Sequence, residues 1–340
     1  MPTSARVIAK PMPSRRRCLV LGAALLAGGA AQPSRAQAPA GTKLVGALWS
    51  GSRDASADNR QAFVDGLAEA GWTPGQNCTL QERYADGDDA RLPALANELV
   101  RVRPQVVFAP TTQATLAVRR VSAQVPVVFA VAADPVGSKL VDSLSRPGRR
   151  TTGVGGLPVD VGAKRIELLR ECLERLNTVV LLKDAGAARD AAVYASVYRA
   201  TDRLRAKVSE IAASSEPELR SAFAQMAASR PGGILVSDGP FFVGHRKLIV
   251  DSVAALNVPA VYPIAAYADE GGLMSYGVKV RDQYRRAAAY VGKILNGANA
   301  DELPVDSAGS FELVINVKTA NALGMKIPKI VLLRADRIVE

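Results

Sequence analysis

The chain has 340 residues, 48% of them hydrophobic, and a mean hydropathy of +0.07. This composition is typical of a globular protein rather than a disordered one, and the length suits two lobes better than a single core. The formal net charge is +11, but residues 1–36 hold six basic and no acidic residues, so the remainder carries only +5. No basic patch is interleaved with aromatic residues, so the composition argues against a nucleic-acid-binding protein.

The first 36 residues indicate a cleaved export signal. Residues 15–17 are three arginines, residues 18–31 are apolar, and Ser34 and Ala36 are small residues placed for cleavage after Ala36. The alternative is a membrane anchor, but an apolar run of 14 residues is short for a bilayer. We therefore expect a periplasmic protein, with the general and the twin-arginine export routes both open.

From Lys43 onward, short apolar runs alternate with amphipathic helical stretches. The predicted strands span residues 43–50, 77–85, 105–110 and 125–135, and the predicted helices between them span residues 58–72, 90–104 and 113–122. The runs are apolar on both faces and are separated by helices, so they predict a parallel sheet that is covered on both sides.

The same alternation then restarts after a glycine-rich stretch at residues 151–156. Helices are predicted at 161–176, 190–207, 217–229, 243–256 and 281–296, and strands at 178–184, 208–212, 233–238 and 258–263. The predicted fold is α/β, with two doubly wound parallel-sheet lobes. Lobe 1 comprises residues 43–152 plus 277–303, and lobe 2 comprises 155–273 plus 306–340. Residues 151–156 and 271–278 are expected to be extended joints of a multi-strand hinge.

Few groups in the sequence could support catalysis or metal binding. His245 is the single histidine, and its basic neighbours indicate a solvated surface position. No nucleophile elbow, phosphate-binding loop or zinc-binding spacing is present. Cys78 and Cys172 fall in different predicted lobes, so free thiols are favoured over a disulfide. We expect no catalytic residue, no metal and no cofactor.

The carboxyl ends of the predicted strands suggest a binding site for a small polar ligand, because ligands of open α/β sheets bind there. Ser50 ends the first strand, and Thr111 and Thr112 lie between a strand and a helix, where hydroxyls and helix amides can hold a carboxylate. Asp134 occupies a similar turn. Ordinary helix capping explains Thr111, Thr112 and Asp134 equally well, and both roles can coexist.

Acidic and aromatic residues complete the predicted site. Asp184 and Asp238 end two strands of the second lobe and are candidates for binding an ammonium group. Phe241, Tyr262 and Tyr276 offer flat surfaces, Tyr276 as part of the hinge or cleft floor. Core packing is the alternative for most of the aromatic residues, Phe242 and Tyr267 included.

An ordered series of short motifs resembles one protein family. The motifs are EAGWTPGQN, ERYADGDDARLPALANELV, VPVVFAVAADPV, RPGRRTTGV, KRIELLRE, DGPFF, EGGLMSYG, YVGKIL and FELVINVKTANALGMKIP. Together they resemble the ABC-transporter substrate-binding proteins of the tryptophan/tyrosine type over residues 43–340. The resemblance implies a type I periplasmic-binding-protein clamshell that captures a small molecule between its lobes. It also implies delivery of that ligand to a membrane permease and its ATPase.

Family members with assigned ligands lean toward aromatic amino acids. This sequence departs from the family where an Asn-Pro-Asn-like turn is common, since Lys183 and Asp184 stand there and change the charge at a predicted cleft position. We expect a monomer. The alternative function is a periplasmic sensory protein that presents its liganded form to a receptor or sensor kinase, and an enzyme is disfavoured by the missing catalytic motifs.

Overall fold

Two β-sheets organise the part of the chain that the computed structural model describes, which is residues 42–340 apart from 133, 157, 159, 186–190 and 308. The predicted export signal lies outside these residues. Residues Thr42–Glu340 form one compact unit, and both sheets lie within it. None of the helices in the described range is long and apolar enough to cross a membrane.

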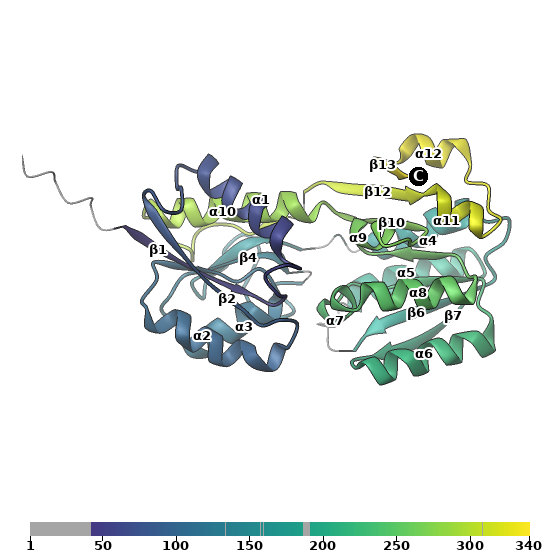
Figure 1. Cartoon of the computed structure of the whole chain (residues 1–340), viewed down its shortest axis with the longest axis horizontal. Coiled ribbons are helices and arrows are strands. Elements are labelled where there is room, and N and C mark those ends of the chain that lie inside the picture. The colour runs from purple at the N-terminus through teal and green to yellow at the C-terminus, as the bar shows by residue number, and fades with distance from the viewer. Residues whose placement is uncertain (1–41, 133, 157, 159, 186–190, 308) are drawn as a thin grey trace, which may run out of the picture. The chain divides into compact units, whose positions relative to one another are not determined.

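Sheet A forms the first lobe and is entirely parallel. Its order is β11-β5-β4-β3-β1-β2, with the strands β1 (Lys43–Trp49), β2 (Cys78–Tyr84), β3 (Val106–Phe108), β4 (Val127–Ala132), β5 (Thr151–Gly155) and β11 (Asp306–Ser307). Helices α1 (Ala57–Glu69) and α10 (Val280–Leu295) cover one face, and α2 (Leu92–Arg101) and α3 (Thr112–Val121) cover the other (Figure 1).

Sheet B forms the second lobe in the order β13-β12-β10-β9-β8-β6-β7. Its strands are β6 (Thr178–Asp184), β7 (Lys207–Ala213), β8 (Gly233–Val236), β9 (Ala260–Tyr262), β10 (Met274–Val278), β12 (Phe311–Asn316) and β13 (Arg337–Val339). Strand β12 runs antiparallel to β10, and the other neighbouring pairs are parallel. The predicted doubly wound parallel architecture is therefore correct, with this one antiparallel pairing added.

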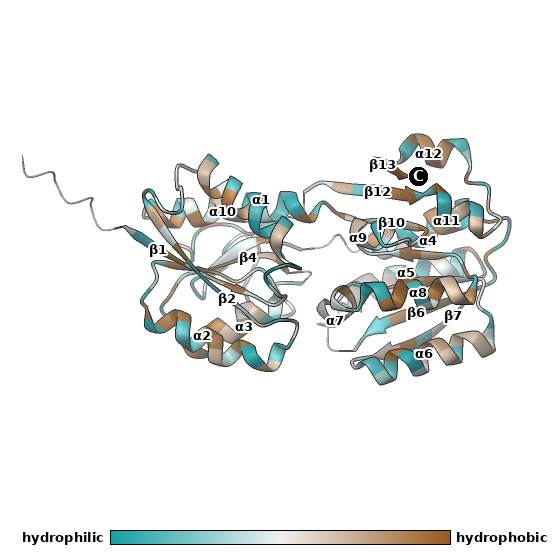
Figure 2. Cartoon of the chain, viewed as in Figure 1, coloured by the Kyte–Doolittle hydropathy of each residue, from teal (hydrophilic) through white to brown (hydrophobic). Residues whose placement is uncertain are grey.

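Helices also cover both faces of sheet B. Helices α4 (Val161–Glu171) and α5 (Ala191–Arg203) pack on one face, and α6 (Glu216–Ser229) and α8 (Arg246–Leu256) pack on the other. The shorter elements are η1 (Asp89–Arg91), α7 (Pro240–Gly244), α9 (Ala265–Asp269), α11 (Val317–Ala322) and α12 (Lys329–Arg334). Strand β6 is mainly apolar but becomes hydrophilic at its carboxyl end (Figure 2).

The two sheets repeat the same winding. In each, the first strand lies second from one edge, the second strand forms that edge, and the third, fourth and fifth follow on the other side. This order reverses direction between β1 and β3 in sheet A and between β6 and β8 in sheet B. Such switch points are where open α/β sheets bind their ligands, outside the carboxyl ends of the strands.

The two segments predicted as extended joints are in fact strands. Residues 151–155 form β5 inside sheet A, and residues 274–278 form β10 inside sheet B, where Val154 and Met274 pack into the two cores. The chain passes between the sheets after β5, after β10 and between β11 and β12.

Two boundaries also differ from the prediction. Residues 306–307 were assigned to lobe 2 but pair with β5 in sheet A. The predicted helix at 243–256 is divided into α7 and α8, because the chain leaves helical geometry at His245 after Gly244. Cys78 and Cys172 are buried and free, one in each lobe, as expected.

Candidate functional site

A large cleft opens at the carboxyl ends of the strands of both sheets. Its volume is about 840 Å³, which lies within the usual range of small-molecule pockets. The first lobe contributes the residues after β1, β2 and β3, and the second lobe contributes the ends of β6 and β8 together with α7. Ser50, Thr111, Thr112, Asp184, Asp238 and Phe241, all predicted from the sequence, line this one cleft.

Hydroxyl groups line the first lobe's side of the cleft. Thr111 is the N-cap of α3, where its side chain accepts a hydrogen bond from the amide of Ala114 at 3.2 Å. The hydroxyls of Ser50 and Thr111 lie 2.7 Å apart and share a hydrogen bond. Capping and cleft lining thus coexist at Thr111.

The first turn of α3 also presents backbone amides. The first amides of a helix have no intrahelical acceptor, and the helix dipole makes this end partially positive. The amides of Thr112 and Gln113 occupy these positions, and both residues line the cleft. This ten-residue helix therefore offers a site for a carboxylate, flanked by two hydroxyls.

A buried ion pair forms the second lobe's side of the cleft. Arg165 on α4 is 2% exposed, and its Nη1 donates to Oδ2 of Asp238 at 2.7 Å. Its Nε donates to the carbonyl of Tyr276 at 2.7 Å, and its Nη2 contacts the carbonyl of Pro263 at 3.3 Å. The Asp238 side chain keeps 33% of its surface exposed in the cleft, so one carboxylate is fixed there by a buried cation.

Asp184 is more buried than the sequence suggested. It is 4% exposed, and its Oδ2 accepts a hydrogen bond from the amide of Phe241, at the start of α7. Its carboxylate packs so closely that a Cβ on Gly239 would lie 2.1 Å from Oδ2, which explains the glycine. Asp184 therefore anchors α7, and Phe241 lines the cleft while Phe242 is buried in the core.

Asp89 brings a further carboxylate to the cleft from the first lobe. It caps no helix with its side chain, and its surroundings raise its pKa, chiefly through loss of bulk water and then through repulsion by Asp184 and Asp88. The influence of Asp184 on Asp89 means that acidic groups of the two lobes face the same space. Such a space favours a positively charged ligand group.

Stacked aromatic rings form the floor of the cleft on the first lobe. Trp49 stacks on Tyr284 with ring centroids 5.9 Å apart and on Tyr84 at 6.1 Å. The indole nitrogen of Trp49 donates to Glu82 at 3.1 Å, which fixes the ring. Trp49 and Tyr284 border the cleft but are only 1% and 6% exposed, so they support its wall from the core of the first lobe. The partly exposed rings in the cleft lining are those of Phe241 and Tyr194 from the second lobe.

Three predicted ligand-binding residues lie outside the cleft lining. Asp134 accepts a hydrogen bond from the amide of Gly137 at 2.7 Å and so stabilises its own turn. Tyr276 points away from the cleft in the middle of β10 and stacks on Phe311 at 5.6 Å. Tyr262 is 1% exposed and stacks on Tyr267 at 5.0 Å. These side chains lie elsewhere because a strand end or turn does not specify which way a side chain faces.

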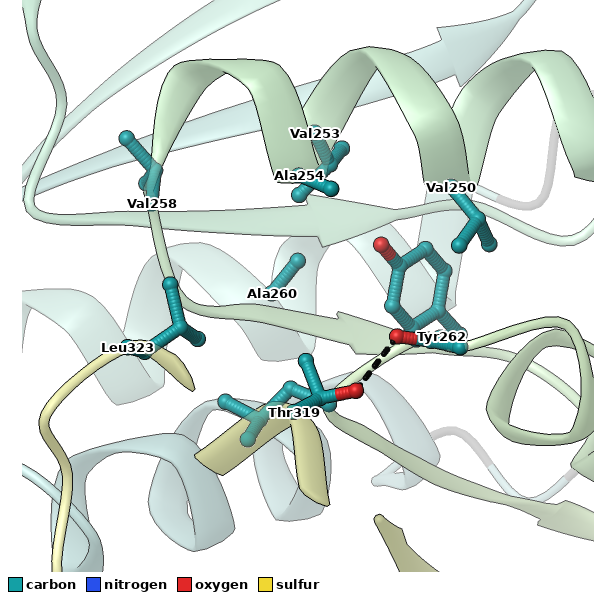
Figure 3. Close-up of a pocket in the computed structure, with 11 residues that line it drawn as sticks. Val250, Val253, Ala254, Val258, Ala260, Tyr262, Thr319 and Leu323 are labelled. Atoms are coloured by element: carbon teal, nitrogen blue, oxygen red, sulfur yellow. Dashed lines mark hydrogen bonds between the residues drawn. The ribbon is translucent and has the colours of Figure 1, made fainter. Parts of the chain in front are cut away.

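Tyr262 borders a second, much smaller cavity. Figure 3 shows its ring beside Val250 of α8, with Thr319 of α11 below, and the dashed bond joins the hydroxyl of Thr319 to the carbonyl of Gly271 at 2.8 Å. The cavity volume is about 20 Å³, enough for about one water molecule. A ligand of amino-acid size does not fit there.

Two charged or polar residues also differ from their predicted settings. The ammonium of Lys183 pairs with Glu210 at 2.7 Å and lies 4.5 Å from the ring centre of Tyr194, so its charge is neutralised beside β7. His245 was expected on the solvated surface, but it is half-buried and lines the cleft. Its Nδ1 lies 2.9 Å from the carbonyl of Phe241, which holds the ring in place.

Sequence reasoning missed two polar residues on buried helix faces. Arg165 falls among the buried positions of α4, next to Ile166 and Leu168, and Gln283 does the same on α10. A charged or amide side chain at a position that the helical periodicity assigns to the core was the available signal. Within the described residues, no cluster of three His, Cys, Asp or Glu side chains could hold a metal ion.

Comparison with known families and proteins accords with this architecture. Residues 48–339 match the family model described as ABC transporter substrate binding protein. A curated relative, the tyrosine-binding protein of Clostridioides difficile strain R20291, is 21% identical over 269 residues, which cover 78% of this chain and 76% of the relative.

Solved structures show the same fold. A conserved domain protein from Vibrio cholerae O1 biovar El Tor aligns with a TM-score of 0.81 and 26% identity, covering 87% of this chain and 99% of the other. An ABC domain from Streptococcus pneumonia in complex with L-Trp aligns with a TM-score of 0.81 and 24% identity, covering 88% and 100% of the two chains. The resemblance to a periplasmic-binding-protein clamshell is thereby confirmed.

Proposed function

The chain belongs to the ABC transporter substrate binding protein family, and from that premise we propose that it captures an amino acid with an aromatic side chain and delivers it to a permease and its ATPase. Members of the family are extracytoplasmic binding proteins that work with a permease, and they are not enzymes. Membership of this family confirms the expectation of a non-enzymatic substrate-binding protein. The identity of the ligand and the participation of the ATPase belong to the proposal.

The observation that supports an amino acid is that one cleft contains both a site for an anion and carboxylates that suit a cation. The α3 terminus, with Thr111 and Thr112, suits a carboxylate, whereas Asp238 and Asp89 suit an ammonium group. A zwitterion matches both walls at once. A sugar would bring no cation to Asp89 or to the exposed part of the Asp238 carboxylate, and a dicarboxylate would be repelled by both.

Two further observations support an aromatic side chain. The partly exposed rings of Phe241 and Tyr194, which line the cleft, give the ligand an apolar surface on which a ring can pack. Two relatives of this chain also support an aromatic ligand, since one is described as a tyrosine-binding protein and the other was crystallised with L-Trp.

The family description supports import, while the sensory alternative finds no support in the relatives reported above. Export through the signal in residues 1–36 and a monomeric state remain part of the proposal. Cleavage after Ala36 would release a protein that begins at Gln37. Mass spectrometry of protein recovered from the periplasm tests this cleavage site.

A thermal-shift screen of residues 37–340 tests the ligand class. The panel holds the aromatic and branched amino acids, dicarboxylates, nucleosides and small sugars. A ligand that binds the folded state alone raises the midpoint, and 100 times its Kd stabilises by about 2.7 kcal/mol. We expect a shift with at least one aromatic amino acid. A shift with sugars or dicarboxylates and none with amino acids would contradict the proposal.

A further inference from the structure

Gln283 is a buried amide that lines the cleft without a protein partner for its donor. The residue lies in the first turn of α10, just after the chain crosses from β10 back to the first lobe. It is 3% exposed, and among the described residues its Nε2 has no hydrogen-bond partner. The neighbouring residues Val278, Val280 and Tyr284 line the same cleft.

The position of Gln283 makes this arrangement unfavourable for the protein alone. The residue shares a helix face with Tyr284, Ala287 and Ala288, which pack into the core of the first lobe. An apolar side chain would fill such a position without loss, because a buried N–H donor that makes no hydrogen bond destabilises the fold. Residues that break the local rules of stability without structural compensation are expected at functional sites.

We propose that Gln283 is a specificity-determining residue, whose side-chain amide donates a hydrogen bond to an acceptor oxygen of the bound ligand. This inference rests on the proposed function, since it concerns the same cleft and the same class of ligand. The Gln283 amide extends the set of donors beyond the α3 terminus to the crossing segment between the lobes. A ligand that lacks an acceptor at this point leaves the amide unsatisfied and binds less tightly.

The variant Gln283→Leu separates a ligand contact from a structural role. Leucine has a similar size and makes no hydrogen bond, so the ligand-free variant should melt about 2 °C higher than the wild type. The same variant should bind the best amino acid of the screen about tenfold more weakly. Gln225→Leu, the same change at an exposed position of α6, serves as the control and should leave the Kd unchanged.

A second variant tests whether the amide acts as a donor. In Gln283→Glu the side chain keeps its shape, but a carboxylate replaces the donor and repels an acceptor oxygen, so the loss of affinity should exceed that of Gln283→Leu. Tighter binding by Gln283→Glu would show that a cationic ligand group lies there and would overturn the proposal.

The remaining outcomes separate this inference from the proposed function. If the wild type binds an amino acid and Gln283→Leu binds it with the same Kd, the inference fails and the proposed function stands. A lower melting temperature with unchanged Kd would mark Gln283 as structural and likewise overturn the inference. If the wild type binds no amino acid at all, the proposed function fails, and the inference fails with it.

Discussion

The guanidinium of Arg165 holds three segments of the second lobe together at the cleft. It contacts the carboxylate of Asp238 after β8, the carbonyl of Pro263 after β9 and the carbonyl of Tyr276 in β10. Gly277 is needed at this point, since a Cβ there would lie 1.7 Å from the carbonyl oxygen of Pro263. Asp238 is therefore both part of the cleft wall and half of a structural ion pair.

Removal of the Asp238 charge should destabilise the fold. Asp238→Asn leaves the buried guanidinium without its counter-charge, and we expect the free energy of unfolding to fall by about 2–3 kcal/mol, as measured by urea denaturation. Asp269→Asn is the matched control, because Asp269 pairs with Arg337 at 2.6 Å while both side chains are 44–49% exposed. Asp269→Asn should lower the free energy of unfolding by less than about 1 kcal/mol. Equal losses in the two variants would contradict the structural role of the buried pair.

The raised pKa of Asp89 predicts a pH-dependent effect on stability. Because the folded pKa lies above the unfolded value, the ionised carboxylate destabilises the folded state above that pKa, and the penalty disappears as the pH falls below it. Asp89→Asn should therefore raise the free energy of unfolding at about pH 7, and the gain should shrink toward about pH 4, near the ordinary pKa of aspartate.

Asp336 supplies a control of the opposite sign. The pKa of its carboxyl is lowered, first by the hydrogen bond from the amide of Leu313, so its charge stabilises the fold above the unfolded pKa, and that stabilisation is lost as the pH falls through the folded pKa. Asp336→Asn should lower the free energy of unfolding at about pH 7, and most of this loss should persist at about pH 4 and fade only at lower pH, because the folded pKa lies below the ordinary value. Urea titrations at both pH values measure the two effects. If Asp89→Asn raised the free energy of unfolding equally at both pH values, the raised pKa of Asp89 would be refuted.

The limits of sequence reasoning are clearest at the scale of single residues. Strand ends predicted the neighbourhood of Ser50, Thr111 and Asp238 correctly, since parallel strands bring their carboxyl ends to one edge. The direction of each side chain was not predictable: Tyr262 is buried in the core, and Tyr276 is partly buried against it. The pairing of Arg165 with Asp238 joins residues 73 positions apart, which no local pattern reveals.

At the scale of elements, α3 contributes most to the polar wall of the first lobe. Thr111 caps its first turn, and Thr112 lines the cleft from the same turn. The strands and helices of both lobes were predictable because periodicity and burial agree along most of the chain. The boundaries between lobes were less predictable, because β5 and β10 contain glycine and other small residues that resemble a linker in the sequence.

Two neighbouring threonines allow capping and ligand binding to be measured separately. Thr111→Val removes the cap and should lower the free energy of unfolding by about 1 kcal/mol, besides weakening ligand binding. Thr112→Val removes a hydroxyl that makes no cap and should change stability by less than about 0.5 kcal/mol, while its ligand Kd rises several-fold. Urea denaturation and titration calorimetry give the two quantities. An unchanged Kd in both variants would exclude the α3 terminus from the ligand site.

At the scale of the whole molecule, the described residues form two similarly wound lobes whose strand ends line one cleft. The first lobe supplies hydroxyls, helix amides and the Asp89 carboxylate, and the second lobe supplies the Arg165–Asp238 pair and the ring of Phe241. A ligand that contacts both lobes stabilises the arrangement that buries it, and it can do so only through interactions that this arrangement alone allows. A zwitterion bound as proposed, between the α3 terminus of the first lobe and Asp238 of the second, would contact both lobes at once.

The most direct test of this account is titration calorimetry of residues 37–340 with the best aromatic amino acid and with two analogues of it, one lacking the carboxylate and one lacking the ammonium group. The account predicts that one equivalent of the amino acid binds and that each analogue binds at least about 100-fold more weakly, because each leaves a charged or polar wall of the cleft unpaired. An analogue that binds as tightly as the amino acid itself would contradict the proposal that the cleft recognises both charged groups of an amino acid.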